Sequence, residues 1–164
     1  MTLRVAILTV SDRSARGERP DSSGPALAKL IQELGWNVVR QDVLPDDLAM
    51  IRESLAAWVD RGDVDVVLTT GGTGFAPRDV TPEATRQVIE REAPGLSEAM
   101  RVASGARSPH AMLSRAIAGI RGRVLIINLP GSPKAAVENL QVVVPALEHA
   151  VSLLQEAPDA EAGH

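Results

Sequence analysis

The amino-acid sequence predicts an α/β fold, a three-layer sandwich in which helices cover both faces of a mostly parallel β-sheet with one antiparallel edge hairpin. The first observation is that apolar, β-branched runs of strand length alternate with segments of helical period. The second is that each run is apolar throughout, as expected for strands buried on both faces. The third is a short turn, Arg121-Gly122, between two such runs, which indicates the hairpin.

Four apolar runs are predicted to form the principal strands of the sheet. Each is rich in β-branched residues and is shorter than a typical helix. The runs are Arg4 to Val10, Asn37 to Leu44, Val64 to Thr70 and Arg123 to Leu129. The hairpin is predicted to join Ser114 to Ile120 with Arg123 to Ile127.

Apolar side chains at helical spacing predict the helices that separate these strands. One helix stops at Gly35 and a second ends before Gly62, because glycine adopts the left-handed conformation that often terminates a helix. The apolar faces of the two helices consist of Leu27, Leu30, Ile31 and Leu34 in the first and Leu48, Ile51, Leu55, Trp58 and Val59 in the second.

Two further helices are predicted to begin at Thr81-Pro82 and Ser132-Pro133. In both pairs a capping hydroxyl precedes a proline that suits the first helical position. The second of these helices keeps its apolar spacing through Leu154, and we expect Pro145 to kink or divide it.

We expect residues 1–155 to form a single domain, because 164 residues of which 45% are hydrophobic suit one core rather than two. The acidic, small-residue segment 156–164 is expected to be disordered. Segment 16–24, rich in Gly, Ser, Pro and charges, is predicted to be a functional loop. No apolar run approaches the roughly 20 residues that cross a bilayer, so we expect a cytoplasmic protein without membrane contact.

The composition excludes several classes of function. A net charge of -4 disfavours general attraction to nucleic acid, and aromatic residues, at 2%, are too few for a base-stacking platform. The absence of cysteine removes thiolate catalysis and disulfides. Any metal ion must therefore be held by oxygen or imidazole ligands.

Polar residues cluster where the predicted strands end. The carboxyl ends of parallel strands meet at one edge of a sheet, where α/β proteins bind ligands, so we expect the loops there to converge on one site. These loops are Thr9-Val10-Ser11-Asp12, Pro45-Asp46-Asp47, Thr69 to Gly74 and Leu129 to Lys134.

The loop Gly71-Gly72-Thr73-Gly74 is the strongest single signal in the sequence. Closely spaced glycines let backbone N–H groups approach a phosphate. No Gly-Lys-Ser/Thr follows the loop, and the glycine spacing is not that of a dinucleotide-binding turn. The same glycines also suit a tight strand-to-helix turn, so the loop alone leaves both interpretations open.

Asp79 follows this loop closely and would repel a bound phosphate unless a cation lay between them. We therefore interpret Asp79 as a Mg²⁺ ligand, with Asp46 or Asp12 supplying a second oxygen from a neighbouring loop. Asp79 is also compatible with an ordinary turn residue, and Asp46 or Asp47 with the cap of the following helix.

Several cations are predicted to lie near this rim and could offset the charge of polyanionic ligands. They are Arg78, Lys134, Arg13 and Arg115. Ser132, as the expected N-cap of the last helix, would place the positive end of that helix at the same site.

Taken together, the motifs resemble those of the MogA/MoaB family, in the same order and with the same spacing along nearly the whole chain. The segment Gly71 to Thr85 is highly specific, and Ala111 to Gly122 is similar to the plant adenylyltransferase domain and the gephyrin G domain. The matching motifs are Thr9-Val10-Ser11-Asp12, Asp21-Ser22-Ser23-Gly24-Pro25, Pro45-Asp46, Thr69 to Gly74, Arg78 to Thr85, Met112-Leu113-Ser114-Arg115 and Leu129 to Pro133.

The resemblance implies a usually trimeric domain that binds molybdopterin and Mg-ATP. It implies a molybdopterin adenylyltransferase, an enzyme of molybdenum-cofactor biosynthesis that forms adenylylated molybdopterin and pyrophosphate, with a molybdenum-insertion enzyme as a downstream partner. Asp46 and Asp79 would be the catalytic residues and would hold Mg²⁺. Substrate and nucleotide binding would involve Ser11, Asp12, Thr70, Gly71, Gly72, Thr73, Gly74, Thr81, Glu83, Ser114, Arg115, Pro130, Gly131 and Ser132.

The implied reaction suits a site without an obvious catalytic base. The phosphate of molybdopterin, with a second pKa of about 6, is already largely anionic at neutral pH, so positioning and charge neutralisation would suffice. One alternative is a trimeric scaffold that binds the pterin without adenylylation, which the presence of Asp46 and Asp79 disfavours. Another is a related nucleotide pyrophosphatase of the competence-associated type, which the motif from Met112 to Arg115 disfavours.

Overall fold

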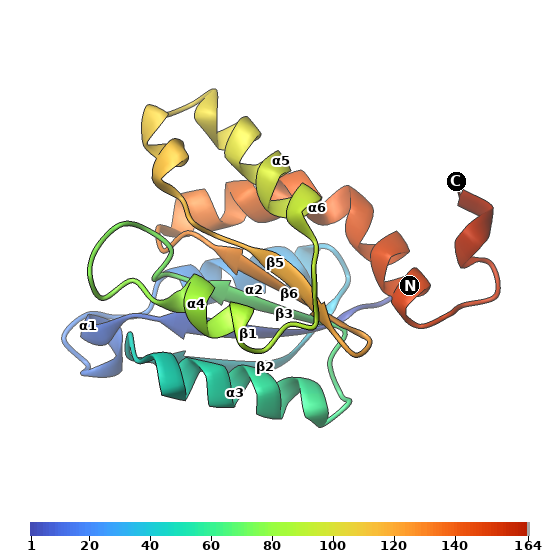
Figure 1. Cartoon of the computed structure of the whole chain (residues 1–164), viewed down its shortest axis with the longest axis horizontal. Coiled ribbons are helices and arrows are strands. Elements are labelled where there is room, and N and C mark those ends of the chain that lie inside the picture. Colours follow the sequence, from blue (N-terminus) through green and yellow to red (C-terminus); the bar gives the residue numbers. More distant parts are fainter. Residues whose placement is uncertain (164) are drawn as a thin grey trace.

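A six-stranded sheet organises the computed structural model, which describes residues 1–163 (Figure 1). The strand order is β2-β1-β3-β6-β5-β4. The first four strands in this order are parallel, β5 is antiparallel to β6, and β4 is antiparallel to β5. The strands are β1 (Arg4–Val10), β2 (Asn37–Leu44), β3 (Val66–Thr70), β4 (Arg91–Glu92), β5 (Ala118–Arg121) and β6 (Val124–Leu129).

Helices cover both faces of this sheet, which confirms the three-layer arrangement. On one face, α2, α5 and α6 pack against the sheet, and α3 and α4 pack against the other (Figure 1). The helices are α1 (Asp12–Ala15), α2 (Ser23–Glu33), α3 (Leu48–Asp60), α4 (Thr81–Arg86), α5 (Pro94–Gly105) and α6 (Pro133–Leu154), with the 3-10 helices η1 (Pro109–Leu113) and η2 (Ala160–Gly163).

The apolar sequence of β1 explains why helices can cover both faces. Successive side chains of a strand point to opposite faces of the sheet. Val5 and Ile7 belong to the core beneath α2 and α6, whereas Ala6, Leu8 and Val10 belong to the core beneath α3 and α4. All five are at most 3% exposed, so β1 is a central strand, as its continuous apolar run predicts.

The predicted hairpin is present as β5 and β6, and Gly122 has a positive φ of 57° in its turn. The outermost strand on this side, however, is β4, which the sequence did not indicate. β5 also begins only at Ala118, four residues later than predicted from Ser114. The opposite edge strand, β2, is only partly buried because it has a neighbour on one side alone.

Two helix predictions need correction. Thr81 is not a cap, because Val80 occupies the N-cap position and the Thr81 hydroxyl donates instead to the Gly71 carbonyl oxygen at 2.9 Å. Pro145 does not divide α6, which is continuous from Pro133 to Leu154. Pro145 lies on the exposed side of α6, where water can satisfy the carbonyl that its missing N–H leaves unbonded.

The segment after α6 was predicted to be disordered. In the structure it includes η2, and Ala160 is 6% exposed, while His164 lies outside the described residues. In the described part of the chain, no helix is both long enough and apolar enough to cross a membrane.

A buried polar network joins the sheet to α4 just below the carboxyl ends of the strands. The fully buried side-chain amide of Asn128 donates to the hydroxyls of Thr69 and Thr85, each at 2.9 Å. Its oxygen accepts from the backbone N–H of Ile117 at 3.2 Å. One side chain thereby connects β6, β3, α4 and the segment that enters β5.

We expect Asn128→Ala to lower the free energy of unfolding by about 2–4 kcal/mol, because it leaves a cavity and three polar groups without their partner. Urea unfolding followed by circular dichroism measures the change. Asn37→Ala, at an exposed position that begins β2, is the control and should change stability by less than about 0.5 kcal/mol. Equal effects of the two substitutions would contradict a stabilising role for the network.

Candidate active site

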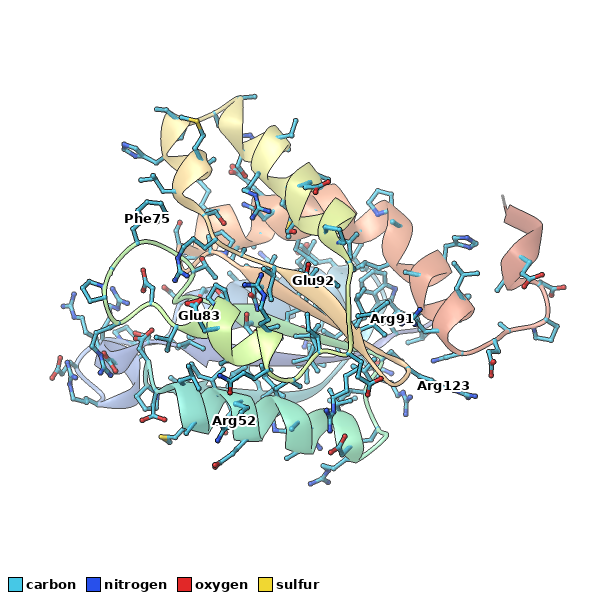
Figure 2. The ribbon with its side chains drawn as sticks, in the orientation of Figure 1. Arg52, Phe75, Glu83, Arg91, Glu92 and Arg123 are labelled. Carbon is cyan, nitrogen blue, oxygen red and sulfur yellow. The ribbon has the colours of Figure 1, made fainter. Side chains whose placement is uncertain are left out.

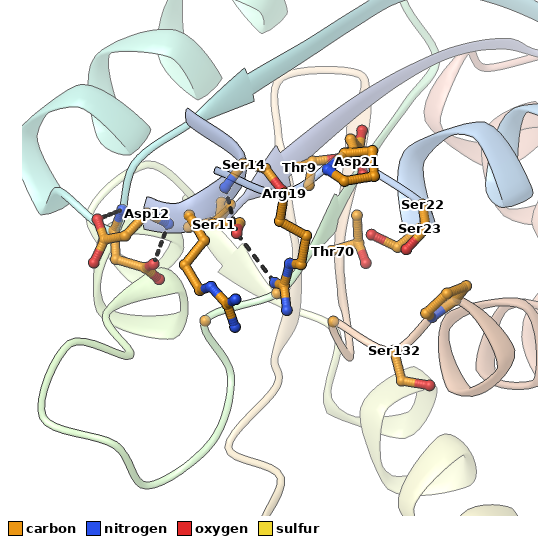
Figure 3. A pocket seen from close by; sticks show the side chains of 18 of the residues that line it. Thr9, Ser11, Asp12, Ser14, Arg19, Asp21, Ser22, Ser23, Thr70 and Ser132 are labelled. Carbon is orange, nitrogen blue, oxygen red and sulfur yellow. Dashed lines mark hydrogen bonds between the residues drawn. The ribbon is translucent and has the colours of Figure 1, made fainter. Parts of the chain in front are cut away.

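The loops that follow β1, β2, β3 and β6 surround a polar cavity of about 490 Å³ (Figure 3). The convergence predicted from the strand ends is therefore present. Nine of the residues predicted for the site line this cavity, namely Ser11, Asp12, Asp46, Thr70, Gly71, Gly72, Asp79, Gly131 and Ser132.

A second cavity, of about 350 Å³, shares two loops with the first, namely the loop after β3 and the loop after β6. Four more predicted residues line it, namely Thr73, Gly74, Ser114 and Pro130. Its other walls come from α5, η1, α6 and the segment that leads into β5, and they include Met100, Leu113 and Ala116. The glycine loop thus contributes Gly71 and Gly72 to the first cavity and the next two residues to the second.

The remaining predicted residues, Thr81, Glu83 and Arg115, line neither cavity. Thr81 is fully buried, and its backbone N–H donates to the Gly72 carbonyl oxygen at 3.1 Å. Arg115 forms an ion pair with Glu83 at 2.8 Å. Within the structure these three residues hold the glycine loop and α4 in place.

Asp12 and Asp46 form a reciprocal pair that joins the loops after β1 and β2. The backbone N–H of Asp12 donates to Asp46 Oδ2, and the backbone N–H of Asp46 donates to Asp12 Oδ1, both at 3.0 Å. Arg78 covers the Asp12 carboxylate with two bonds, at 2.7 and 2.9 Å. Asp46 Oδ1 makes no such bond among the described residues, and it remains available to a ligand.

The two carboxyl groups consequently differ in their proton affinity. The guanidinium of Arg78 lowers the pKa of Asp12 below its ordinary value. Burial raises the pKa of Asp46, and the nearby charges of Asp12 and Asp79 raise it further. The negative charge of Asp46 is thus only partly compensated by the residues around it, and a bound cation would relieve this environment.

This arrangement predicts how stability depends on pH. A carboxyl group whose pKa is raised by folding destabilises the folded state when ionised, and the penalty disappears as pH falls through the raised pKa. We therefore expect Asp46→Asn to make the ligand-free protein more stable at pH 7, with the gain shrinking at acidic pH. Thermal unfolding between pH 4 and 8 tests this expectation. Asp42→Asn, at an exposed position of β2, matches the change in net charge, and an equal gain in both variants would contradict it.

Asp79 reaches the cavity from the loop between β3 and α4. Its Oδ2 accepts from the backbone N–H of Ala76 at 3.1 Å, and its own N–H donates to the Ala76 carbonyl oxygen at 2.9 Å. Asp79 also lines the cavity together with Asp46. Within the described residues no group of three or more His, Cys, Asp or Glu side chains could hold a metal ion.

The backbone requires glycine at two positions of the glycine loop. Gly71 and Gly72 have φ values of 102° and 68°, in the region that L side chains rarely adopt. A Cβ at Gly71 would collide with the Val10 carbonyl, and one at Gly72 would collide with the Thr81 hydroxyl and lie 3.0 Å from Asp46 Oδ1. The loop is therefore both the tight turn and a cavity wall, and Gly72→Ala would disturb the turn as well as any phosphate contact.

The structure also shows which of these residues are helix caps. Asp47 is the N-cap of α3, and its side chain accepts from Met50 N at 2.9 Å, whereas Asp46 faces the cavity. Ser132 is the N-cap of α6, as predicted, and accepts from Ala135 N at 3.3 Å.

Of the four cations that the sequence indicated, Arg13 lines the polar cavity, and the other three line neither cavity. Arg78 and Arg115 pair with carboxylates, and Lys134 lies 4.0 Å from Glu138 and lines neither cavity. Arg13 and Arg19 line the polar cavity, and neither has a carboxylate within ion-pair distance in the described part of the chain.

Arg19 was missed as an individual residue. It lies in the segment 16–24 whose composition predicted a functional loop, and its guanidinium donates to Ser11 Oγ at 3.3 Å (Figure 3). The same segment brings Asp21, Ser22 and Ser23 to the cavity. Composition therefore located the loop, but only the fold shows which of its side chains turn inward.

Residues 6–149 match a family model described as "Probable molybdopterin binding domain". The chain belongs to this molybdopterin-binding domain family. A relative named molybdopterin adenylyltransferase, from Helicobacter pylori strain J99, is 42% identical over 93% of this chain and 88% of its own length. The crystal structure of a molybdopterin biosynthesis enzyme, MoaB from Thermus thermophilus, is 50% identical with a TM-score of 0.89, covering 94% of this chain and 98% of that one.

Members of the molybdopterin-binding domain family also occur inside longer proteins. The molybdenum cofactor synthesis protein cinnamon from Drosophila melanogaster is 46% identical over 93% of this chain. That match covers only 26% of the length of the Drosophila protein.

Proposed function

We propose that this protein is a molybdopterin adenylyltransferase of molybdenum-cofactor biosynthesis. In the reaction, an oxygen of the molybdopterin phosphate attacks the α-phosphorus of ATP, the bond to the β-phosphate breaks, and pyrophosphate leaves with its electron pair. The observation that carries the proposal is a pair of adjacent cavities with shared loops as walls, one of them polar and lined by four aspartates that include Asp46 and Asp79. A reaction between two large substrates needs two neighbouring sites of this kind.

The polar cavity suits the phosphates. Gly71 and Gly72 bring backbone close to it, and Ser132 places the N-terminus of α6 there, where N–H groups and the helix dipole attract anions. The second cavity has more apolar walls, including Met100 and Leu113, and suits a ring system. The phosphates and the ring of a substrate would then lie on either side of the shared loops.

Asp46 and Asp79 fit a Mg²⁺ site. Both are carboxylates in the polar cavity, and the raised pKa of Asp46 marks a charge that lacks compensation. Mg²⁺ favours one or two carboxylates together with substrate phosphates, and Asp46 and Asp79 would supply two carboxylates. When bound there, the ion would offset the charge that develops on the phosphates.

Arg13 and Arg19 are the cations that would bind the β- and γ-phosphates. Both line the polar cavity, and neither forms an ion pair with a carboxylate in the described part of the chain. We expect Arg13→Gln combined with Arg19→Gln to raise the KM for Mg-ATP by about 10–100-fold, with a smaller effect on kcat. Steady-state kinetics at saturating molybdopterin measures the change. Arg16→Gln is the matched control in the same loop, because Arg16 pairs with Glu18 and does not line the cavity. An unchanged KM in the double variant would exclude this role.

We also propose an oligomeric state, a cellular location and a downstream partner for this protein. The family resemblance supports a homotrimer, a cytoplasmic location, a single domain over residues 1–155 and transfer of the product to a molybdenum-insertion enzyme. Sedimentation equilibrium of the purified protein tests the trimer directly, and a monomer at all concentrations would exclude it.

The deciding experiment supplies purified protein with molybdopterin, ATP and Mg²⁺. We expect adenylylated molybdopterin and pyrophosphate to form in equal amounts. Mass spectrometry detects the first product, and a coupled assay measures the second. Tight molybdopterin binding without pyrophosphate release would instead favour a non-catalytic scaffold. Pyrophosphate or phosphate release from ATP in the absence of molybdopterin would favour a hydrolase.

A further inference from the structure

Between Gly74 and Asp79, the loop that carries Asp79 forms no backbone hydrogen bond with a strand among the described residues, and its middle is tied to the loop after β1 only through the exposed side chain of Arg78, which bonds to Asp12. The loop leaves β3 through Gly74 and reaches α4 at Thr81, and its central residues, from Phe75 to Arg78, are exposed. Figure 2 shows Phe75 on this loop and Glu83 on α4, where the chain continues. An exposed connection of this kind is ordinarily mobile, yet a carboxylate that binds a metal ion must be held in a defined position.

Arg115 anchors the two ends of this loop from a distant part of the chain. Its Nε donates to the Gly74 carbonyl oxygen and its Nη2 donates to the Asp79 carbonyl oxygen, each at 2.7 Å. Its backbone N–H donates to the Thr73 carbonyl oxygen at 2.8 Å. One residue therefore binds both ends of the loop.

Glu83 holds the guanidinium in the orientation that these bonds need. Arg115 Nη1 lies 2.8 Å from both carboxylate oxygens of Glu83, in the first turn of α4. The start of α4 is itself fixed, because Thr81 bonds to the carbonyls of Gly71 and Gly72. All three nitrogens of the guanidinium are thus used, by groups that flank the loop on both sides.

We propose that Arg115 is the positioning residue of this site, which holds the loop from Gly74 to Asp79 so that the Asp79 carboxylate lies in the polar cavity. The inference rests on the proposed function for the role of Asp79. Arg115 lines neither cavity and therefore acts through the loop rather than on a substrate. A lysine at this position would keep the charge, but a single ammonium group cannot reproduce three fixed directions of donation.

Hydrogen–deuterium exchange of the ligand-free protein tests the positioning role without any assay of activity. The reporters are the N–H groups of Ala76 and Asp79, which bond within the loop. We expect Arg115→Lys to speed exchange in a peptide covering residues 74–80 by at least about tenfold, because the loop opens more often. Unchanged exchange in this peptide would overturn the proposal.

Arg121→Lys is the matched control. Arg121 also pairs with a carboxylate, that of Asp60, and donates to a backbone carbonyl, that of Val88, but it belongs to the β5–β6 hairpin and lines neither cavity of the site. It should leave exchange in residues 74–80 unchanged. Should Arg115→Lys fail to fold, Glu83→Gln removes only the partner that orients the guanidinium, and faster exchange confined to the same peptide is then expected.

Kinetics distinguish positioning from a general loss of stability. We expect Arg115→Ala to lower kcat by about 10²-fold with a change in the KM for Mg-ATP below about threefold, since a misplaced catalytic group impairs turnover more than binding. Added guanidinium ion should restore at least about a tenth of the lost turnover in Arg115→Ala and none in Asp79→Asn. Failure of rescue, or a loss of binding equal to that of turnover, would overturn the proposal. A wild-type protein that forms no product would instead refute the proposed function, while the exchange experiment would still decide whether Arg115 holds the loop.

Discussion

Replacing Asp79 by asparagine is expected to lower turnover by at least about 10²-fold while the protein still folds. The side-chain oxygen that accepts from Ala76 N at 3.1 Å is kept in asparagine, so the loop retains its internal bond. Only the negative charge is lost, and with it the attraction for a metal ion beside the phosphates. Pyrophosphate release at saturating molybdopterin and Mg-ATP measures the effect, and circular dichroism verifies the fold.

Asp47→Asn is the control for this substitution. Asp47 is the exposed N-cap of α3 next to Asp46, and asparagine is an equally good capping residue. Its turnover should stay within about twofold of wild type. If Asp79→Asn were as active as this control, Asp79 would have no part in binding a metal ion or in catalysis.

Chelation of divalent ions is expected to have the second large effect. Excess EDTA should lower pyrophosphate release by at least about 10³-fold, because the charges of the phosphates would then face Asp46 and Asp79 without a cation. Adding Mg²⁺ back should restore the rate. The midpoint of thermal unfolding should be unaffected by EDTA, since the described chain contains no cluster of three potential ligands that could hold a structural ion.

A metal titration assigns the effect to the polar cavity. We expect Asp46→Asn to raise the Mg²⁺ concentration at half-maximal rate by about tenfold, because one of two carboxylates is lost. Asp42→Asn, on the exposed edge strand, should leave the titration unchanged. Full activity in the presence of excess chelator would refute the proposed metal requirement.

The sequence was sufficient to predict the elements whose signal is local. β1 and β6 could be predicted because they are apolar at nearly every position. In the structure both are central strands, and every residue of β6 and every residue of β1 except Arg4 is buried. The ends of α2 and α3 could be predicted because glycine often terminates a helix. In the structure Gly35 and Gly62 have the positive φ values, 77° and 74°, that such an end requires.

Elements that depend on distant partners were not predictable in this way. β4 consists of two exposed charged residues, Arg91 and Glu92, and it is a strand only because it pairs with β5. α5 was not predicted because few large apolar residues mark its inner face, on which Ser97 and Met100 are the buried residues. Local propensity cannot indicate either case.

The same distinction applies to the site. Asp46 and Asp79 could be placed at one rim because both follow strand-like segments, and the topology of parallel sheets brings such positions together. The bond between Arg78 and Asp12 joins residues 66 apart, and that between Arg115 and Glu83 joins residues 32 apart. The sequence indicated Arg78 and Arg115 as contacts for a ligand, but in the structure both are paired with carboxylates. Pairs between residues this far apart in sequence can be seen only in the fold.

The exposed tip of the loop between β3 and α4 also offers a place for an optical reporter. Phe75 is 67% exposed and lines neither cavity, and the chain contains no cysteine. Phe75→Cys would therefore introduce a unique thiol, to which a single environment-sensitive dye can be attached. Because the base of the loop contains Asp79, the emission of that dye would follow the arrival and departure of substrates in real time, without a label on either of them.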